Sequence, residues 1–322
     1  MDGAGSVESR LQGDFLKFRQ FLVKEDIEGA MLESVSILER SRSKEERDPV
    51  IEALVRMERA LHGSGDPVFV GTELRWCVDR LNAVSPGSAN HGVCLLNLAA
   101  WHRNRGETMM SLSTHSDISL SHGHPSEVVG LSRLEVSRIM ANLGDIDPAM
   151  RHLWSARQCL SDSGMVPEAL SASLEWLNLA LEEVDSESPR MSTRIAEAAP
   201  RSNPGRSWVA SNPDDVREVV ESLMPVLLSD VSGEERRDIG LLLDAAEALG
   251  EESWPNEVSR LSAEIQDPRV LDALQSGLRD PSISSVPQPT FRGISMHHPT
   301  SPIRAASDDP GTGTGSPPTR PQ

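Results

Sequence analysis

A recurring spacing of apolar residues is the dominant pattern along this chain. Ala149, Leu153 and Ala156 follow Gly144 at distances of five, nine and twelve residues. Because an α-helix completes a turn about every 3.6 residues, these three positions lie on one face of a helix. The pattern therefore predicts a turn at Gly144, followed by a helix that buries this face.

The same frame occurs three more times upstream. Gly106, Gly65 and Glu25 precede Gly144 in steps of 38, 41 and 40 residues. The residues at the same distances are Ser111, His115 and Ile118, then Val70, Leu74 and Cys77, and finally Ala30, Ser34 and Ile37. A fixed period of roughly 34 to 47 residues, with a helix pair in each unit, is typical of an α-solenoid. The alternative is a plain antiparallel helical bundle with coincidental spacing.

Helical patterns cover most of the chain and break at proline and glycine. Alternating runs of β-branched and aromatic residues are nearly missing, so we expect an all-α fold. The expected helices are 11–24, 27–41, 49–62, 67–83, 92–105, 108–121, 126–143, 148–161, 167–184, 189–199, 213–229, 233–249, 255–265 and 268–278. Pro148 is expected in the first turn of its helix, with Asp147 as the N-cap.

Composition divides the chain into four parts. Residues 1–199 are expected to form a helical repeat array, and the proline- and glycine-containing segment 200–212 a linker. Residues 213–279 are expected to form an acidic helical block that continues or caps the array. The tail, 280–322, is rich in Pro, Ser, Thr and Gly. It has too little apolar surface to offset the entropy lost on ordering, so we expect it to be disordered.

The repeated frame resembles the tetratricopeptide repeat family. The residues that carry the resemblance are Leu143, Gly144, Asp145, Ala149, Leu153 and Ala156, with Ser137 and Ala99 each seven residues before a frame glycine. The units here are longer than the family's usual length of about 34 residues. The resemblance implies a right-handed α-solenoid of antiparallel helix pairs, whose concave groove binds a protein or peptide.

Composition and cysteine usage indicate the compartment. Hydrophobic residues make up 38% of the chain and aromatic residues 3%, so Leu, Ala, Val and Met must build the core. Cys77, Cys94 and Cys159 are scattered and odd in number, which favours a reducing compartment over a disulfide framework. The N-terminal sequence lacks the basic start and apolar core of a signal peptide, and no apolar run approaches about 20 residues. We therefore expect a cytoplasmic protein without membrane contact.

The net charge of −18 is concentrated in the second half of the chain. Residues 161–280 contain 25 acidic and 10 basic residues, a net charge of −15. This block can serve simply as a solvated surface, or it can attract a basic partner. Nucleic acid is not an expected partner, because phosphate binding requires clustered positive charge.

Several residues invite a chemical interpretation. His115, Asp117, His122 and His124 lie close together in sequence, and three or more of them would have to converge to bind a metal. Capping and surface histidines are the simpler interpretation, so we expect neither a metal nor a cofactor. His-Glu-x-x-His, Gly-x-Ser-x-Gly and dinucleotide-binding motifs are missing from the sequence, and we do not expect an enzyme.

The family resemblance places a peptide-binding groove along the first helix of each pair. Positions six, three or two before each frame glycine should face it, and the polar residues there are Arg59, His62, Arg103, Asn104, Arg138 and Asn142. Arginine binds carboxylates through two hydrogen bonds, and asparagine can bind an extended backbone. We therefore expect a scaffold or adaptor that binds an acidic or C-terminal-carboxylate peptide. The alternative is a regulatory or sensor arm of a transcriptional or signalling assembly, and the oligomeric state is left open.

Overall fold

In the part of the chain that the computed structural model describes, every regular element is a helix. That part comprises residues 4–63, 65–181, 213–229, 239–251 and 253–256. The helices are α1 (Ala4–Val23), α2 (Ile27–Arg42), α3 (Pro49–Gly63), α4 (Pro67–Val84), α5 (Ala89–Asn104), α6 (Thr108–Ser116), α7 (Ser126–Asn142), α8 (Ile146–Asp162), α9 (Val166–Leu181), α11 (Pro213–Ser229) and α12 (Ile239–Leu249), with a short 3-10 helix, η1 (Leu120–His122). The expected all-α class is confirmed for these residues.

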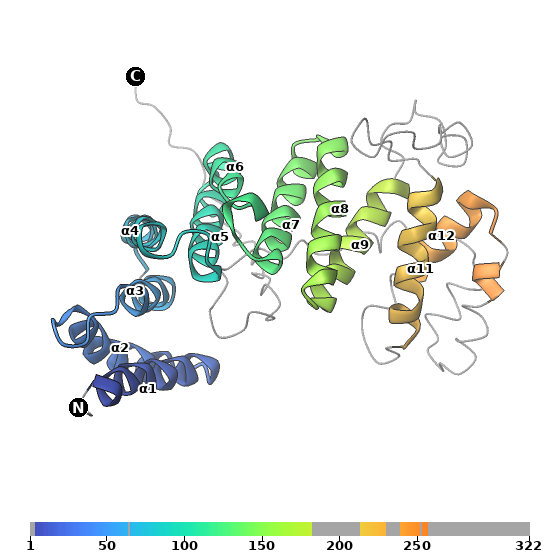
Figure 1. Ribbon diagram of the computed structural model, residues 1–322. Helices are drawn as coiled ribbons and strands as arrows, with labels where there is room; N and C mark the ends of the chain where they lie inside the picture. Colours follow the sequence, from blue (N-terminus) through green and yellow to red (C-terminus); the bar gives the residue numbers. More distant parts are fainter. Residues whose placement is uncertain (1–3, 64, 182–212, 230–238, 252, 257–322) are drawn as a thin grey trace, which may run out of the picture.

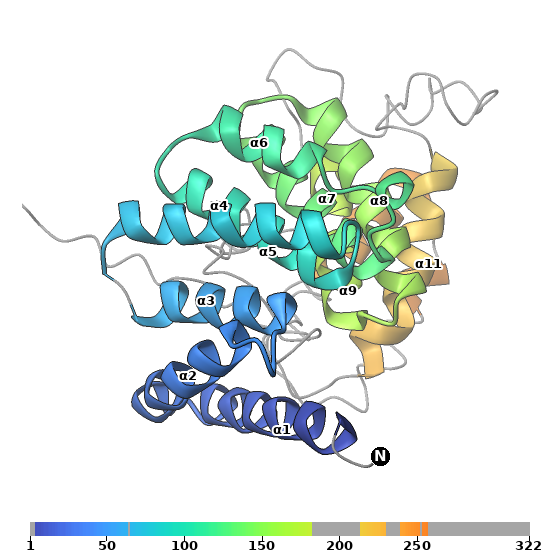
Figure 2. The same cartoon turned by 60° about the vertical axis from the view of Figure 1, so that its left-hand side comes forward.

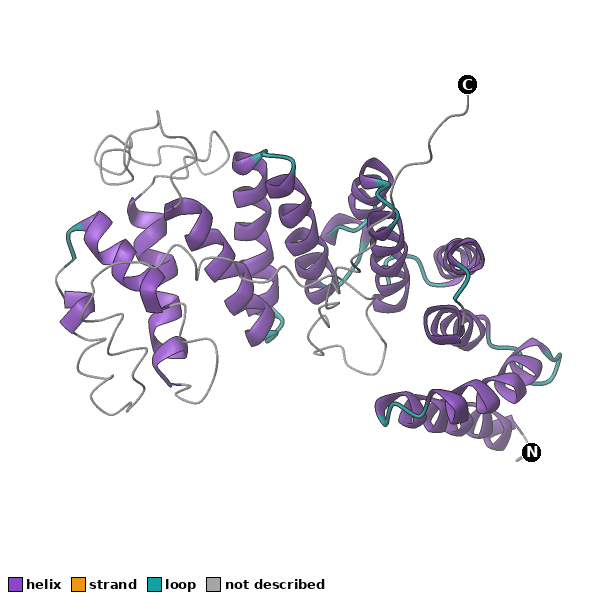
Figure 3. Ribbon diagram, turned by 180° about the vertical axis from the view of Figure 1, so that it is seen from behind, coloured by secondary structure: helices purple, strands orange, loops and turns teal. Residues whose placement is uncertain are grey.

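The helices stack in chain order into an elongated array. Helices α1 to α9 each pack against the next in sequence, α5 also contacts α7, and both α11 and α12 contact α9. Figure 1 shows α1 and α2 at one end of the array and α11 and α12 at the other, and Figure 3 shows the same succession from behind. Side-chain contact is therefore mainly between sequence neighbours, and the array offers long outer surfaces.

One turn geometry recurs between successive helices. Glu25, Gly106, Gly144 and Gly164 all have positive φ, at 58°, 75°, 82° and 75°. In each case the N–H of the next residue donates a 2.9 Å hydrogen bond to the carbonyl five residues before it. This bond satisfies a carbonyl that the end of the helix leaves without a partner. The turns predicted at Glu25, Gly106 and Gly144 are thus confirmed, whereas Gly65, the fourth frame position, does not have a positive φ.

The face predicted from the spacing is the buried face. Ala149, Leu153 and Ala156 are at most 1% exposed. Of the nine residues at the same positions in the other three frames, eight are buried and only Val70 is half-buried. The turn at Gly164 begins a further frame that the sequence analysis missed, in which the buried residues are Ala169, Ser173 and Trp176.

The apolar interior consists of two clusters that meet at α5. One includes residues of α1 to α4 together with Cys94 and Leu98 of α5. The other includes Leu95 and Leu96 of the same helix and extends to α12. Neighbouring faces of α5 therefore pack into different cores, and this helix joins the two halves of the array.

Two local expectations were wrong. The helix expected at 108–121 ends at Ser116 and is followed by η1 and a left-handed Gly123, because the short loop must return the chain to α7. The expected N-cap, Asp147, lies inside α8, which begins at Ile146 after Asp145. The prediction failed because Gly144 ends the preceding turn earlier than the position of Pro148 suggests.

Several expectations fall on residues outside the described ranges. They are the end of the helix expected at 167–184, from residue 182, the helix at 189–199, the linker at 200–212, the start of the helix expected at 233–249, up to residue 238, the helices at 255–265 and 268–278 beyond residue 256, and the tail at 280–322. The division into array, linker and acidic block stays a prediction. The acidic helices α11 and α12 pack on α9 and contribute to the same apolar cluster.

Candidate functional site

The predicted groove residues lie near the C-terminal ends of α3, α5 and α7. His62, Asn104 and Asn142 are exposed there. Asn104 and Asn142 occupy equivalent positions, each two residues before a left-handed glycine. The repeated turn therefore presents similar polar side chains at the ends of two successive first helices.

Arg59 and His62, both on α3, each contact a neighbouring polar side chain. The Arg59 guanidinium donates a 2.8 Å hydrogen bond to the hydroxyl of Ser34 on α2. The imidazole of His62 lies 3.3 Å from a carboxylate oxygen of the fully buried Glu58, one turn earlier. Both side chains remain partly exposed, and hence both can still meet a ligand.

Arg103 and Arg138 belong to an ionic network that crosses three helices. Arg103 of α5 pairs with Glu135 of α7, and Glu135 also accepts a 2.8 Å hydrogen bond from Arg138. Arg138 in turn contacts both carboxylate oxygens of Glu175 on α9, at 3.1 Å from its Nε. The hydroxyl of Ser171 completes the group, at 3.4 Å from the Arg138 guanidinium. The network thus connects α5, α7 and α9 by side chains alone.

Because this network is largely buried, it contributes to the stability of the fold and is poorly accessible to a ligand. The side chains of Arg138 and Glu135 are each 3% exposed. Burial by itself lowers the pKa of Arg138, but the charges and hydrogen bonds of Glu175 and Glu135 outweigh it, so the pKa is raised. Removing one member would leave a buried charge without its partner, which typically costs about 3–5 kcal/mol. A ligand therefore has much better access to Asn104 and Asn142 than to Arg138.

Sequence reasoning missed the two glutamates of the network. A signal for Glu135 was present, since it lies three residues before Arg138 and therefore on the same helix face. Glu175 gave none, because it is 37 residues from Arg138 and belongs to another helix. Only the stacking of α7 and α9 brings these two charges together.

The histidines considered for metal binding have separate roles. His115 is buried and lies 3.0 Å from the hydroxyl of Ser132. His124 stacks on His91, with 3.2 Å between its Nε2 and the Nδ1 of His91. His122 is exposed, and its Nδ1 lies 2.9 Å from the carbonyl oxygen of Asp117. Within the described ranges, no three His, Cys, Asp or Glu side chains are grouped so that they could hold a metal ion.

Burial disfavours the charged form of both stacked imidazoles. It is the main cause that lowers the pKa of both His91 and His124. The His124 imidazole adds to the effect at His91, and the His122 imidazole at His124, where a backbone hydrogen bond with Ser119 opposes it. Backbone N–H groups of Gly87 and Ser119 each point at an Nδ1 atom, 3.3 Å away. An uncharged pair fits this arrangement, because each Nδ1 then accepts a hydrogen bond.

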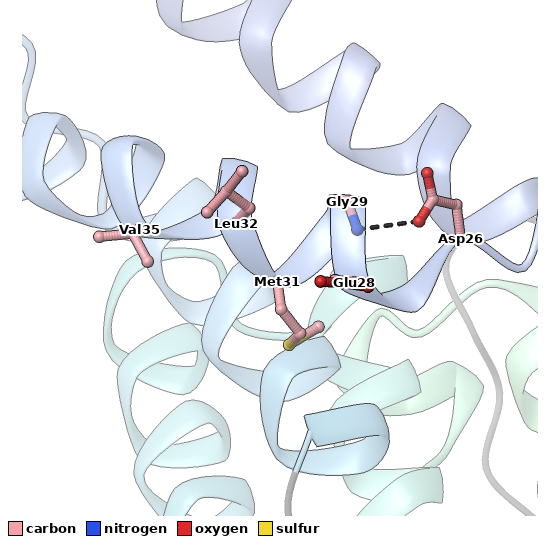
Figure 4. A pocket seen from close by; sticks show the side chains of 6 residues that line it. All are labelled: Asp26, Glu28, Gly29, Met31, Leu32 and Val35. Carbon is pink, nitrogen blue, oxygen red and sulfur yellow. Dashed lines mark hydrogen bonds between the residues drawn. The ribbon is translucent and has the colours of Figure 1, made fainter.

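An open pocket lies on α2 near one end of the array. It has a volume of about 570 Å³, and its lining residues are Asp26, Glu28, Gly29, Met31, Leu32 and Val35. In Figure 4 the Asp26 carboxylate accepts a hydrogen bond from the Gly29 N–H, and Met31 points toward the neighbouring helix. Leu32 is 79% exposed, so this pocket combines an apolar surface with two carboxylates.

Among the described helices, none combines the length and the apolar character needed to cross a bilayer. Comparison with known proteins gives no relative: neither a family model nor a curated protein sequence matches the chain.

Proposed function

We propose that the protein is a binding scaffold whose helical repeats hold an acidic protein segment or a peptide C-terminal carboxylate. The recurrence of one turn geometry at the ends of successive helices carries this proposal. It sets Asn104 and Asn142 at equivalent, exposed positions on α5 and α7. In this proposal the array is a right-handed, tetratricopeptide-like solenoid, and the first helices α3, α5 and α7 form its binding face.

The ionic network supports the proposal by making the binding face rigid. Arg103, Glu135 and Arg138 connect α5 to α7, and Glu175 extends the network to α9, so the spacing between the ends of α5 and α7 is fixed before a ligand arrives. A preorganised surface loses less conformational freedom on binding, and its affinity is higher for that reason. In this role Arg138 positions the face, whereas the exposed polar side chains contact the ligand.

Paired peptides provide the test. A fluorescein-labelled acidic decapeptide with a free C-terminal carboxylate and its C-terminal amide would be titrated with the full-length protein, followed by fluorescence anisotropy. We expect the Asn104→Ala/Asn142→Ala variant to bind the acidic peptide roughly tenfold more weakly, since each lost hydrogen bond contributes about 0.5–1.5 kcal/mol. Arg59→Gln should weaken binding further.

Asn82→Ala is the matched control, because Asn82 is exposed on α4 and outside the first helices. It should bind like the unaltered protein. A preference for the free carboxylate over the amide would identify the C-terminal group as the ligand, and equal affinity would identify the acidic side chains. If the asparagine variant and the Asn82→Ala control bind equally well, the groove proposal is wrong.

A further inference from the structure

A second surface lies where the first turns of α4 and α6 come near the end of α5. Its centre is Trp101, whose indole N–H donates a 2.8 Å hydrogen bond to the carbonyl of Pro67 at the start of α4. The six-membered ring of the indole lies over Gly71, where an added Cβ would come within 2.3 Å of a ring carbon. Figure 2 shows the α3–α4 and α5–α6 connections on the same side of the array.

Exposed apolar side chains occupy equivalent positions in the first turns of α4 and α6. Val68 and Phe69, in the first turn of α4, are 66% and 48% exposed. Met109 and Met110, in the first turn of α6, are 75% and 53% exposed. Both pairs lie three and four residues after their frame glycines, so the repeat itself produces the two-part surface. Clustered exposed apolar side chains often mark a site of protein contact.

Two arginines complete the surface around the indole. The guanidinium carbons of Arg75 and Arg105 lie 4.8 and 4.9 Å from the ring centroid of Trp101. Arg105 is already paired with Glu107. Arg75 is exposed and has no ion-pair partner among the described residues, so its charge can accept a carboxylate from outside.

We propose that this surface, formed by Val68, Phe69, Arg75, Trp101, Met109 and Met110, is a docking site for a partner-protein segment that combines apolar side chains with carboxylates. Because Arg75 is positively charged, the partner segment is expected to carry negative charge where it meets this residue. A guanidinium held against an indole is preorganised for a carboxylate, and tryptophan and arginine are common anchors of protein interfaces. The flexible methionines adapt to apolar side chains of different shapes.

This site does not depend on the groove. Asn104→Ala/Asn142→Ala should leave binding at the Trp101 surface unchanged, and substitutions at the Trp101 surface should leave binding in the groove unchanged. Failure of one proposal can therefore be distinguished from failure of the other.

The test begins with peptide display on the full-length protein, with counter-selection against the variant Arg75→Glu/Met109→Ser. Both residues are exposed, so the variant should fold, and circular dichroism would verify it. We expect the enriched sequences to combine Asp or Glu with Leu, Ile or Phe. Enrichment of basic sequences, or no enrichment over the counter-selected variant, would overturn the proposal.

A synthetic peptide with the enriched sequence then gives the affinities by fluorescence anisotropy. Arg75→Glu should weaken binding roughly tenfold or more, because it replaces an attractive charge by a repulsive one. Met109→Ser/Met110→Ser should weaken it several-fold. The matched controls are Arg151→Glu on α8 and Leu32→Ser on α2, both at exposed positions away from this surface, and they should retain affinity.

Gel filtration tests whether the surface binds a partner protein or a second copy of this chain. If the unaltered protein is a dimer and the Arg75→Glu/Met109→Ser variant is a monomer, the surface is a self-association interface, and the proposed acidic partner is wrong. An unchanged elution volume, together with the loss of peptide binding, supports the proposal.

Discussion

Glu25 has the left-handed backbone conformation that glycine has at the other turns of this kind. Its φ is 58°, while Gly106, Gly144 and Gly164 lie between 75° and 82°. A side chain in this region clashes with the backbone, and glycine avoids that cost but loses more entropy on folding. We therefore expect Glu25→Gly to raise the free energy of unfolding by about 1 kcal/mol, measured by urea denaturation.

The control for this prediction separates the backbone from the carboxylate. Glu25→Ala removes the carboxylate but keeps a Cβ in the left-handed conformation. The glycine variant should be more stable than the alanine variant, whatever the carboxylate contributes. If the two variants have the same stability, relief of backbone strain does not explain the gain.

At the scale of helices, α4 and α5 approach closely only because residue 71 is glycine. An added Cβ would lie 2.3–2.6 Å from three atoms of the Trp101 ring, which is shorter than any van der Waals contact. Gly71→Ala must displace the indole and break its 2.8 Å hydrogen bond to Pro67. We expect a loss of about 1–3 kcal/mol of stability, with a shift in tryptophan fluorescence.

Gly13 in α1 provides the matched comparison, because an added Cβ there meets no atom within 4 Å. Gly13→Ala should keep or increase stability, by up to about 1 kcal/mol, through its higher helix propensity. Combining Gly71→Ala with Trp101→Leu should cost less than the sum of the two single changes, since the smaller side chain leaves room for the Cβ. Simple additivity would show that the clash is not the cause.

At the scale of the whole molecule, the stacked His91 and His124 lie at the N-terminal ends of α5 and α7, close to where the two apolar clusters meet. Burial and the neighbouring imidazoles lower the pKa of both. The charge of Asp117 opposes the shift at each, as does a backbone hydrogen bond from Ser119 at His124. The pKa of the buried His115 falls to about 3 for the same main reason. A lowered pKa means that the folded state binds protons less readily than the unfolded chain does.

Stability should therefore fall as the pH drops below about 6.5, the ordinary histidine pKa in the unfolded chain. The loss should reach at most about 1.4 kcal/mol per pH unit for each histidine that stays neutral. Urea unfolding at pH 7.5, 6.5 and 5.5 measures this loss of stability. The slope should be smaller in His91→Asn/His124→Asn than in the unaltered protein, because the unfolded chain of the variant has two fewer histidines to protonate. An identical slope in the two proteins would contradict the role of the pair.

The candidate site was only partly predictable. Asn104 and Asn142 could be found because the glycine frame alone determines their place at a helix end. The roles of Arg103 and Arg138 could not, because their partners Glu135 and Glu175 lie 32 and 37 residues away. Which charges meet at that separation depends on how the helices stack, and no spacing within one helix encodes it.

The sequence by itself determined the helical class, the recurrent turns and the buried face of each frame. These features depend on residues within a few positions of one another: glycine accepts a left-handed φ, and the 3.6-residue turn brings positions five, nine and twelve to one side. The tertiary structure decided the rest, including the two cores that share α5, the ionic network across α5, α7 and α9, and the arginines stacked on Trp101. Those contacts join separate helices, and the sum of many weak packing interactions sets their geometry.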